Sequence, residues 1–186
     1  MVRGDRTLTL ALVALTAAVA PTMPRPAAAA SAAEISRDAA AALRKLCASQ
    51  PAAKMLSERA KGILVFPRMV KAGFMFGGQM GEGALLKGGK TVAYYNSVAA
   101  SYGLQAGVQT FGYALFFMND AALKQLDATH GFEVGMGPSI VVVDQGVAKS
   151  MTSNTVTSDV YAFIFSQKGL MAGLGIQGSK ITKISK

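Results

Sequence analysis

The spacing of hydrophobic residues changes along this chain, and each change marks a different kind of element. Apolar side chains recur every three or four positions over residues 34–47, while charged residues fill the positions between them. This spacing predicts an amphipathic helix, because residues three and four apart share one face of a helix. Pro51 suits the first turn of a second short helix that carries Met55 and Leu56.

Strand-like patterns begin after Lys61. Residues 63–66 form a short β-type run that ends at Pro67, and residues 73–83 place glycine or a large apolar side chain at almost every position. Residues 91–119 carry no charged side chain and are long enough for a membrane-spanning helix. Polar residues are spread along this stretch, so we expect separate buried strands there and not a transmembrane helix.

The remainder of the chain alternates strands and turns around one more short helix. Asn119 and Asp120 are expected to cap a helix over residues 121–127. Strands are expected over residues 134–143, 160–165 and 170–184, with a turn at residues 144–146 and a hairpin turn at residues 88–91. The predicted fold class is α+β, with N-terminal helices packed on a strongly curved, glycine-rich, mainly antiparallel sheet or barrel-like body.

Glycines two positions apart recur in the predicted sheet. Because residues two apart share one face of a strand, each pair of glycines leaves a lane without side chains on that face. Such a lane allows strong curvature and close packing, and it also offers room for the acyl chain of a lipid. Both interpretations stay open for the three pairs, which are Gly81 and Gly83, Gly135 and Gly137, and Gly173 and Gly175.

Residues 1–30 have the three parts of a secretory signal peptide. Arg3 and Arg6 give a basic start, residues 8–20 form an uncharged apolar run, and the alanines that follow offer small-x-small cleavage sites. We expect cleavage between residues 28 and 33, and therefore a periplasmic or secreted protein.

The mature chain is expected to form one domain. Its helical segment covers residues 31–60 and its β-dominated body covers residues 61–186. Cys47 does not stand at a lipobox position, so we do not expect a lipoprotein; a small hydrophobic side chain buried on a helix is its expected role.

The charge balance of the chain favours anionic partners. The formal net charge is +9, and without residues 1–30 there remain 16 basic and 9 acidic side chains, a net charge of +7. Anionic phospholipid and nucleic acid are the two main classes of partner. Export removes nucleic acid, and no basic–aromatic stacking platform is present. The candidate lipid-binding residues gather within thirty positions beside one acid, Glu82; they are Lys61, Arg68, Lys71, Lys87 and Lys90.

No pattern of catalytic or metal-binding residues accompanies this charge. The one histidine, His130, stands beside Gly131 in an expected turn, far along the chain from Cys47. A nucleophile needs a base within reach, and a metal site needs several ligands at suitable spacing. We therefore expect no enzyme activity, no cofactor and no metal.

Short glycine- and aromatic-rich motifs run through the body of the chain in a fixed order. They are residues 61–67 (KGILVFP), 71–74 (KAGF), 81–83 (GEG), 100–107 (ASYGLQAG), 137–138 (GP), 159–163 (DVYAF) and 168–173 (KGLMAG). In this order they closely resemble the SYLF domain, over roughly residues 40–186. The resemblance implies a lipid-binding module. Eukaryotic members bind phosphoinositides and in some cases actin filaments, and bacterial members are commonly exported single-domain proteins.

Three functions are compatible with these features. The first is peripheral binding to anionic phospholipid membranes through a basic surface. The second is a carrier or sensor that encloses an apolar ligand against the glycine-lined sheet. The third is a structural or interaction module of the cell envelope. Export separates the domain from cytoplasmic actin, so actin is not an expected partner, and the oligomeric state stays open.

Overall fold

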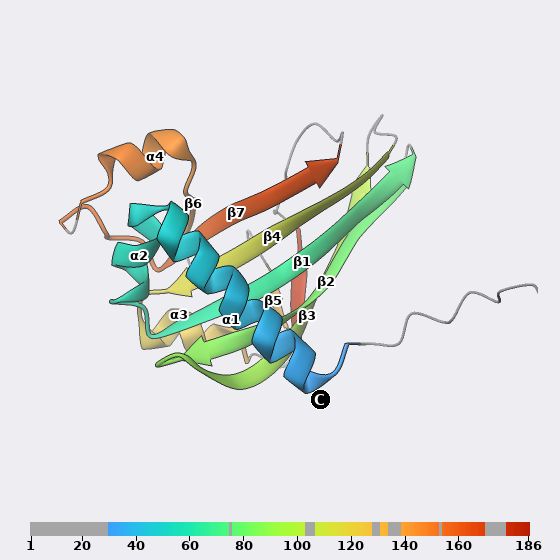
Figure 1. The fold of residues 1–186 in the computed structure, drawn as a ribbon, viewed down its shortest axis with the longest axis horizontal. Coiled ribbons are helices and arrows are strands. Elements are labelled where there is room, and N and C mark those ends of the chain that lie inside the picture. Colours follow the sequence, from blue (N-terminus) through green and yellow to red (C-terminus); the bar gives the residue numbers. More distant parts are fainter. Residues whose placement is uncertain are drawn as a thin grey trace, which may run out of the picture.

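One sheet of eight strands forms the framework of the fold. The computed structural model describes residues 30–74, 76–102, 107–127, 131–133, 139–152, 154–169 and 178–186. The strands are β1 (Gly62–Phe74), β2 (Phe76–Lys87), β3 (Lys90–Tyr102), β4 (Gly107–Phe117), β5 (Phe132–Glu133), β6 (Ile140–Val142), β7 (Val160–Gly169) and β8 (Lys180–Ile184). Their order is β5-β8-β3-β2-β1-β4-β7-β6, and all neighbours pair antiparallel except β6 and β7 (Figure 1).

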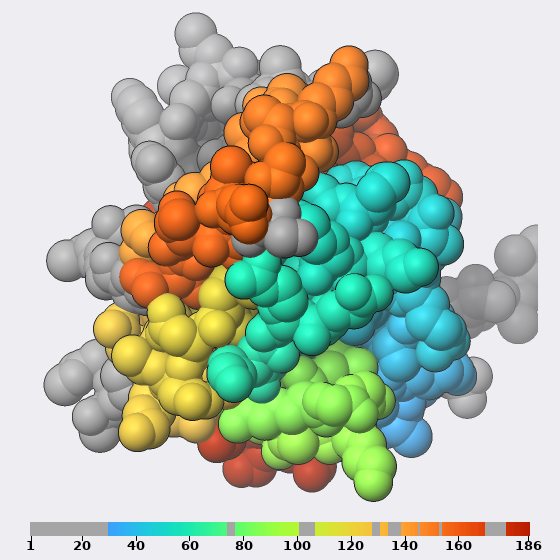
Figure 2. Space-filling model, turned by 90° about the vertical axis from the view of Figure 1, so that its left-hand side faces the viewer, coloured from blue at the N-terminus to red at the C-terminus, as the bar shows by residue number. Residues whose placement is uncertain are grey.

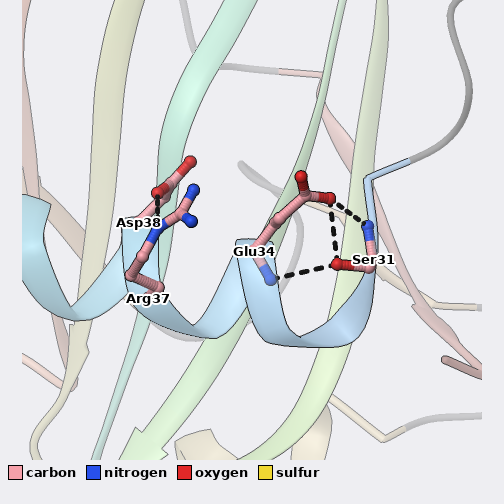
Figure 3. A network of polar contacts seen from close by, with 4 residues as sticks. All are labelled: Ser31, Glu34, Arg37 and Asp38. Atoms are coloured by element: carbon pink, nitrogen blue, oxygen red, sulfur yellow. Dashed lines mark hydrogen bonds and ion pairs between the residues drawn. The ribbon is translucent and has the colours of Figure 1, made fainter.

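Two helices precede the sheet, α1 (Ala32–Ser49) and α2 (Pro51–Ser57). A capping box starts α1: the Glu34 backbone N–H donates to the Ser31 hydroxyl at 3.2 Å, and the Ser31 N–H donates to the Glu34 carboxylate at 2.8 Å (Figure 3). Pro51 disfavours helical backbone at Gln50, where α1 ends, and begins α2 as its first residue. The predicted helix after residue 34 and the predicted short helix at Pro51 are confirmed.

The two faces of the sheet pack against different helices. Alternate residues of β1 point to opposite faces: Ile63 and Val65 pack with α1 and α2, whereas Leu64 and Phe66 pack with α3 (Asp120–Gln125). We call the face under α1 the outer face and the face under α3 the inner face. α1 lies across β1 and β2 on the outer face (Figure 1). Both predicted features, N-terminal helices on a sheet and an α+β fold, are confirmed.

The sheet curls strongly toward its inner face. Phe132 of β5, at one end of the strand order, packs edge-on against Phe117 of β4, with ring centroids 5.9 Å apart. Four strands lie between β5 and β4 in the strand order, so only a strongly curled sheet brings these two rings together. The result is a half-barrel whose inner face carries one of the two hydrophobic cores.

A bulge in β1 and two glycines of β2 make this curl possible. The pairing of β1 with β4 shifts between Phe66 and Met69. A Cβ atom added to Gly81 would lie 2.5 Å from the Met69 sulfur, and one added to Gly83 would lie 2.6 Å from the Phe66 ring. At this pair, therefore, the predicted close packing is confirmed and the space is filled by protein side chains. The pairs at residues 135–137 and 173–175 lie outside the described residues.

Local predictions are partly confirmed and partly wrong. The hairpin turn is formed by Gly88 and Gly89, whose φ angles of 56° and 78° suit glycine in a two-residue turn. The helix after Asn119 and the strand from residue 160 are also present. Two local expectations are wrong. β1 does not end at Pro67, because the bulge accommodates a residue without an N–H. Asp144 caps a short helix, α4 (Gln145–Ser150), where a turn was expected.

The long uncharged stretch forms sheet. Residues 91–119 supply most of β3 and β4, as predicted. Among the described residues, no helix has both the length and the apolar character needed to span a bilayer.

Replacing Gly83 by alanine tests the packing behind the curl. The new methyl group would lie 2.5 Å from the Val65 carbonyl oxygen, so we expect Gly83→Ala to lower the free energy of unfolding by about 1–3 kcal/mol. Chemical denaturation measures the change. The control is Gly78→Ala on the same strand, whose methyl group would meet its nearest neighbour, the Ala99 carbonyl oxygen, at 3.5 Å. Equal losses in the two variants would contradict this packing.

Candidate functional site

Part of the outer face lies beyond the reach of α1. The strands β1 to β4 extend past this helix toward the β1–β2 hairpin (Figure 1). Among the described residues, three of the most exposed large hydrophobic side chains lie on this stretch: Met80 is 62% exposed, Val98 48% and Val108 63%. A group of large apolar side chains left open to water in this way marks a candidate binding surface.

These residues belong to a row that crosses six strands. Neighbouring members are paired by the strand register, and the row runs Lys180 (β8), Val98 (β3), Met80 (β2), Val70 (β1), Thr110 (β4) and Lys168 (β7). We call these six residues the outer row. Its four central members are three apolar residues and a threonine, and exposed lysines stand at both ends.

A second row beside the outer row is made of small and apolar residues. It runs Ala100, Gly78, Ala72 and Val108 across β3, β2, β1 and β4. Gly78, Ala72 and Ala100 have small side chains or none, so the larger side chains of Met80 and Val108 project above them. The combination of projecting apolar side chains and flanking ammonium groups suits a partner that is apolar inside and anionic at its surface.

The predicted basic residues do not form one surface. Lys61, Lys87 and Lys90 are exposed at the end of the sheet that holds the β2–β3 turn, opposite the β1–β2 hairpin. Figure 2 faces this end, where the green β2–β3 turn, the yellow α3 segment and the teal α2 segment lie together. Arg68 is exposed in the β1 bulge beside α1, where it lines a small hollow with Asp38 and Lys45.

Lys71 was expected on the surface and lies inside the half-barrel. Its side chain is 4% exposed. It shares the inner face with Met69, because residues two apart in a strand point the same way. The prediction that Lys71 contacts lipid headgroups at the protein surface is therefore wrong, because its side chain is buried on the inner face.

Acidic neighbours balance the charge at the β2–β3 turn. Lys87 lines a hollow of 340 Å³ together with Asp120, Lys124 and Asp127. The Asp127 carboxylate accepts a hydrogen bond from the Tyr95 hydroxyl at 2.8 Å. It also forms an ion pair with the Lys183 ammonium at 3.0 Å. This end of the molecule therefore carries mixed charge.

The Asp127 cluster also shifts the pKa values of its members. Partial burial raises the pKa of Asp127, but the hydrogen bonds from Lys183 and Tyr95 outweigh burial and hold this pKa below its ordinary value. Burial, and then the hydrogen bond to Asp127, raise the pKa of the Tyr95 phenol. Burial alone raises the pKa of Tyr113.

Other residues considered for chemistry have structural roles where the structure describes them. Asp144 caps α4, Asp159 accepts a hydrogen bond from the Asn119 amide at 2.6 Å, and Glu82 pairs with Lys186 at 2.8 Å. Cys47 is half-buried and packs against the core under α1. Within the described ranges no three His, Cys, Asp or Glu side chains gather as metal ligands would. His130 lies outside those ranges.

A comparison with known families matches residues 98–186 to the family Ysc84, described as "Las17-binding protein actin regulator". This match confirms the SYLF resemblance predicted from the motifs. It includes β4, β7 and β8 and four members of the outer row, Val98, Thr110, Lys168 and Lys180. No curated protein matches the chain.

The ion pair of Asp127 predicts an acid-sensitive contribution to stability. Because the folded pKa of Asp127 is lowered, its contribution is present above the ordinary aspartate pKa of about 3.9 and is lost as pH falls through the folded pKa. We expect Asp127→Asn to melt below the wild type at neutral pH, with a difference that closes in acid. Thermal melts across this pH range measure it. A difference that stays constant down to a pH of about 2 would contradict the prediction.

Proposed function

We propose that this chain, whose residues 98–186 match the Ysc84 family, binds peripherally to membranes that carry anionic phospholipid. The observation that carries the proposal is the outer row, a partly exposed and mainly apolar strip between Lys168 and Lys180. The family resemblance supports a lipid partner. The geometry of the row supports binding to the surface of a bilayer.

The energies of such a contact suit reversible binding. Burying apolar surface contributes roughly 25 cal/mol per Å², so insertion of Met80 and Val108 is favourable by a few kcal/mol at most. Each lysine near an anionic surface adds about 1 kcal/mol. These modest contributions must also offset the lost freedom of the bound protein. Binding should therefore be weak for one domain, reversible and sensitive to salt.

The charges beside the outer row are partly compensated by ion pairing. Glu82 is on the outer face of β2, two residues from Met80, and its carboxylate pairs with the Lys186 ammonium at 2.8 Å. The pair removes a negative charge that would otherwise repel an anionic membrane close to the row. Lys168 keeps its positive charge near the bilayer surface, whereas Lys180 is paired in the strand register with the exposed Glu133 of β5, which reduces its contribution.

The family description also names Las17 binding and actin regulation. We do not extend these partners to this chain, because we propose that residues 1–30 direct its export. The basic start, the apolar run and the alanine-rich cleavage region support that proposal. On this proposal the membrane that the domain meets belongs to the cell envelope.

Vesicle sedimentation tests the membrane proposal. The protein should sediment with vesicles of phosphatidylcholine and phosphatidylglycerol and stay in solution with phosphatidylcholine alone, because lysines need anionic headgroups. Met80→Asp together with Val98→Asp should weaken binding at least about tenfold, since two carboxylates would enter the apolar interface. Lys168→Glu with Lys180→Glu should also weaken it and reduce its salt dependence.

A charge-matched control separates the outer row from basic charge in general. Lys87→Glu with Lys90→Glu makes the same change of net charge at the opposite end of the sheet, and we expect its binding to stay near that of the wild type. Loss of binding in this control, with the outer-row variants unaffected, would place the membrane contact at the β2–β3 turn and refute our assignment. No binding to either vesicle would refute the membrane proposal itself.

Processing of the leader tests export. When the full chain is expressed in a bacterium with a general secretory pathway, the protein should be found in the periplasmic fraction. Mass spectrometry should show a mature N-terminus created by cleavage between residues 28 and 33. Full-length protein retained in the cytoplasm would contradict the proposal.

A further inference from the structure

A hollow of 310 Å³ lies beside α1 on the outer face. Four polar side chains line it: Asp38 and Lys45 from α1, Arg68 from the β1 bulge and Ser166 from β7. Small and apolar residues of the same three elements form the rest of its wall. A hollow of this size with a few convergent polar groups suits the polar group of a small molecule or of a lipid.

The hollow borders the outer row. Arg68 stands two residues before Val70 in β1, and Ser166 stands two residues before Lys168 in β7. Val70 and Lys168 are both members of the outer row, so the hollow lies between this row and α1. A molecule held there would lie at the edge of the surface that we assign to the membrane.

The charged groups of the hollow are available to a ligand. Within the described structure, neither the Lys45 ammonium nor the Arg68 guanidinium forms an ion pair. Asp38 accepts a hydrogen bond from the Nε atom of Arg37 at its Oδ1 atom, at 2.9 Å, and both side chains are exposed (Figure 3). Because an exposed ion pair of this kind is weak, the Asp38 carboxylate can receive a second cation.

The opposite charges of α1 stand at a defined separation. Asp38 and Lys45 are seven residues apart, which is two turns of a helix, so they share one face and lie about 10 Å apart along it. The hollow therefore has a negative group toward the start of α1 and a positive group toward its end. A zwitterionic ligand, with a phosphate and an ammonium joined by a short link, has the complementary arrangement of charge.

The backbone of Ser166 is strained. Its φ angle is 52°, and it is the one non-glycine residue with a positive φ in the part of the chain that the structure describes. Such strain is common at binding sites. Within the described structure its hydroxyl has no hydrogen-bond partner. Glycine would adopt this φ without strain, but glycine has no hydroxyl to donate to a ligand.

We propose that this hollow binds a phosphoethanolamine group, in which two carbons join a phosphate to a primary ammonium. Arg68 and Lys45 pair with the phosphate, and the Ser166 hydroxyl donates to one of its oxygens. The Asp38 carboxylate accepts a hydrogen bond from the ammonium. Phosphocholine carries the same charges, but its trimethylammonium has no N–H to donate. The hollow therefore discriminates between the two groups.

This chemistry has two sources, a soluble phosphodiester and the headgroup of a phospholipid. The lipid source rests on the proposed membrane function, whereas the soluble source does not. The experiments therefore measure the two separately, with the same pair of headgroups in each.

Soluble headgroups test the site without a membrane. NMR titration of the full chain measures weak affinities for glycerophosphoethanolamine and glycerophosphocholine. We expect the ethanolamine compound to bind at least about tenfold more tightly, because only its ammonium can donate to Asp38. Equal affinity for the two compounds, or no binding of either, overturns the proposal.

Vesicles of matched charge test the lipid source. Both sets contain the same fraction of phosphatidylglycerol, and the remaining lipid is phosphatidylethanolamine in one set and phosphatidylcholine in the other. We expect tighter binding to the ethanolamine set. A preference among the soluble compounds without a preference between the vesicles overturns the lipid source. Failure to bind either vesicle set, with the soluble preference intact, refutes the membrane function and leaves the hollow as a soluble-ligand site.

Variants of the charged residues assign their roles. Asp38→Asn should abolish the preference for ethanolamine over choline in both assays, because a neutral amide does not form an ion pair with the ammonium. Arg68→Gln should weaken the binding of both soluble compounds about tenfold. The control, Arg44→Gln, makes the same exchange at an exposed residue of α1 outside the hollow, and it should change neither affinity nor preference.

Ser166→Gly separates binding from folding. It should raise the melting temperature, because glycine accepts a φ of 52°, and weaken the binding of glycerophosphoethanolamine, because the hydroxyl is lost. A residue with a structural role alone would change the melting temperature and leave the affinity unaltered. If Ser166→Gly and Arg68→Gln both fold and bind the compound as the wild type does, the ligand lies elsewhere and the assignment is wrong.

Discussion

The fit between the β1 bulge and the glycines of β2 is the constraint on which the rest of the structure depends. Met69 and Phe66 occupy the space that side chains at Gly81 and Gly83 would take. This fit lets the sheet curl until β5 reaches β4, where Phe132 packs on Phe117. Curling gives the two faces different surroundings. The inner face encloses side chains, whereas the outer face beyond α1 stays open to solvent.

Each face then presents its own chemistry through the simple alternation of a strand. Met80 and Gln79 are neighbours in the sequence, yet Met80 projects into solvent from the outer row and Gln79 is buried on the inner face. The same alternation separates Val70 from Lys71. The same strands therefore carry a partly exposed, mainly apolar surface on the outer face and buried polar side chains on the inner face.

Helical spacing, capping residues and turn glycines made the local elements predictable. Ser31 and Glu34 begin α1, and Gly88 with Gly89 forms the hairpin, because these signals act within a few residues. The outer row was missed because its six members come from six strands, and strand register depends on the tertiary fold. Charge alone suggested Lys71 for the surface. The signal that it lies inside is Met69 two residues earlier, a large apolar residue on the same face.

Site-specific fluorescence tests the central claim, membrane contact through the outer row, most directly. Cys47→Ser provides a cysteine-free background, in which Met80→Cys or Lys90→Cys carries an environment-sensitive dye. With anionic vesicles, our account predicts a blue shift and quenching by lipid-borne quenchers for the dye at position 80, and no change at position 90. A dye that responds at position 90 and stays water-exposed at position 80 would contradict the account.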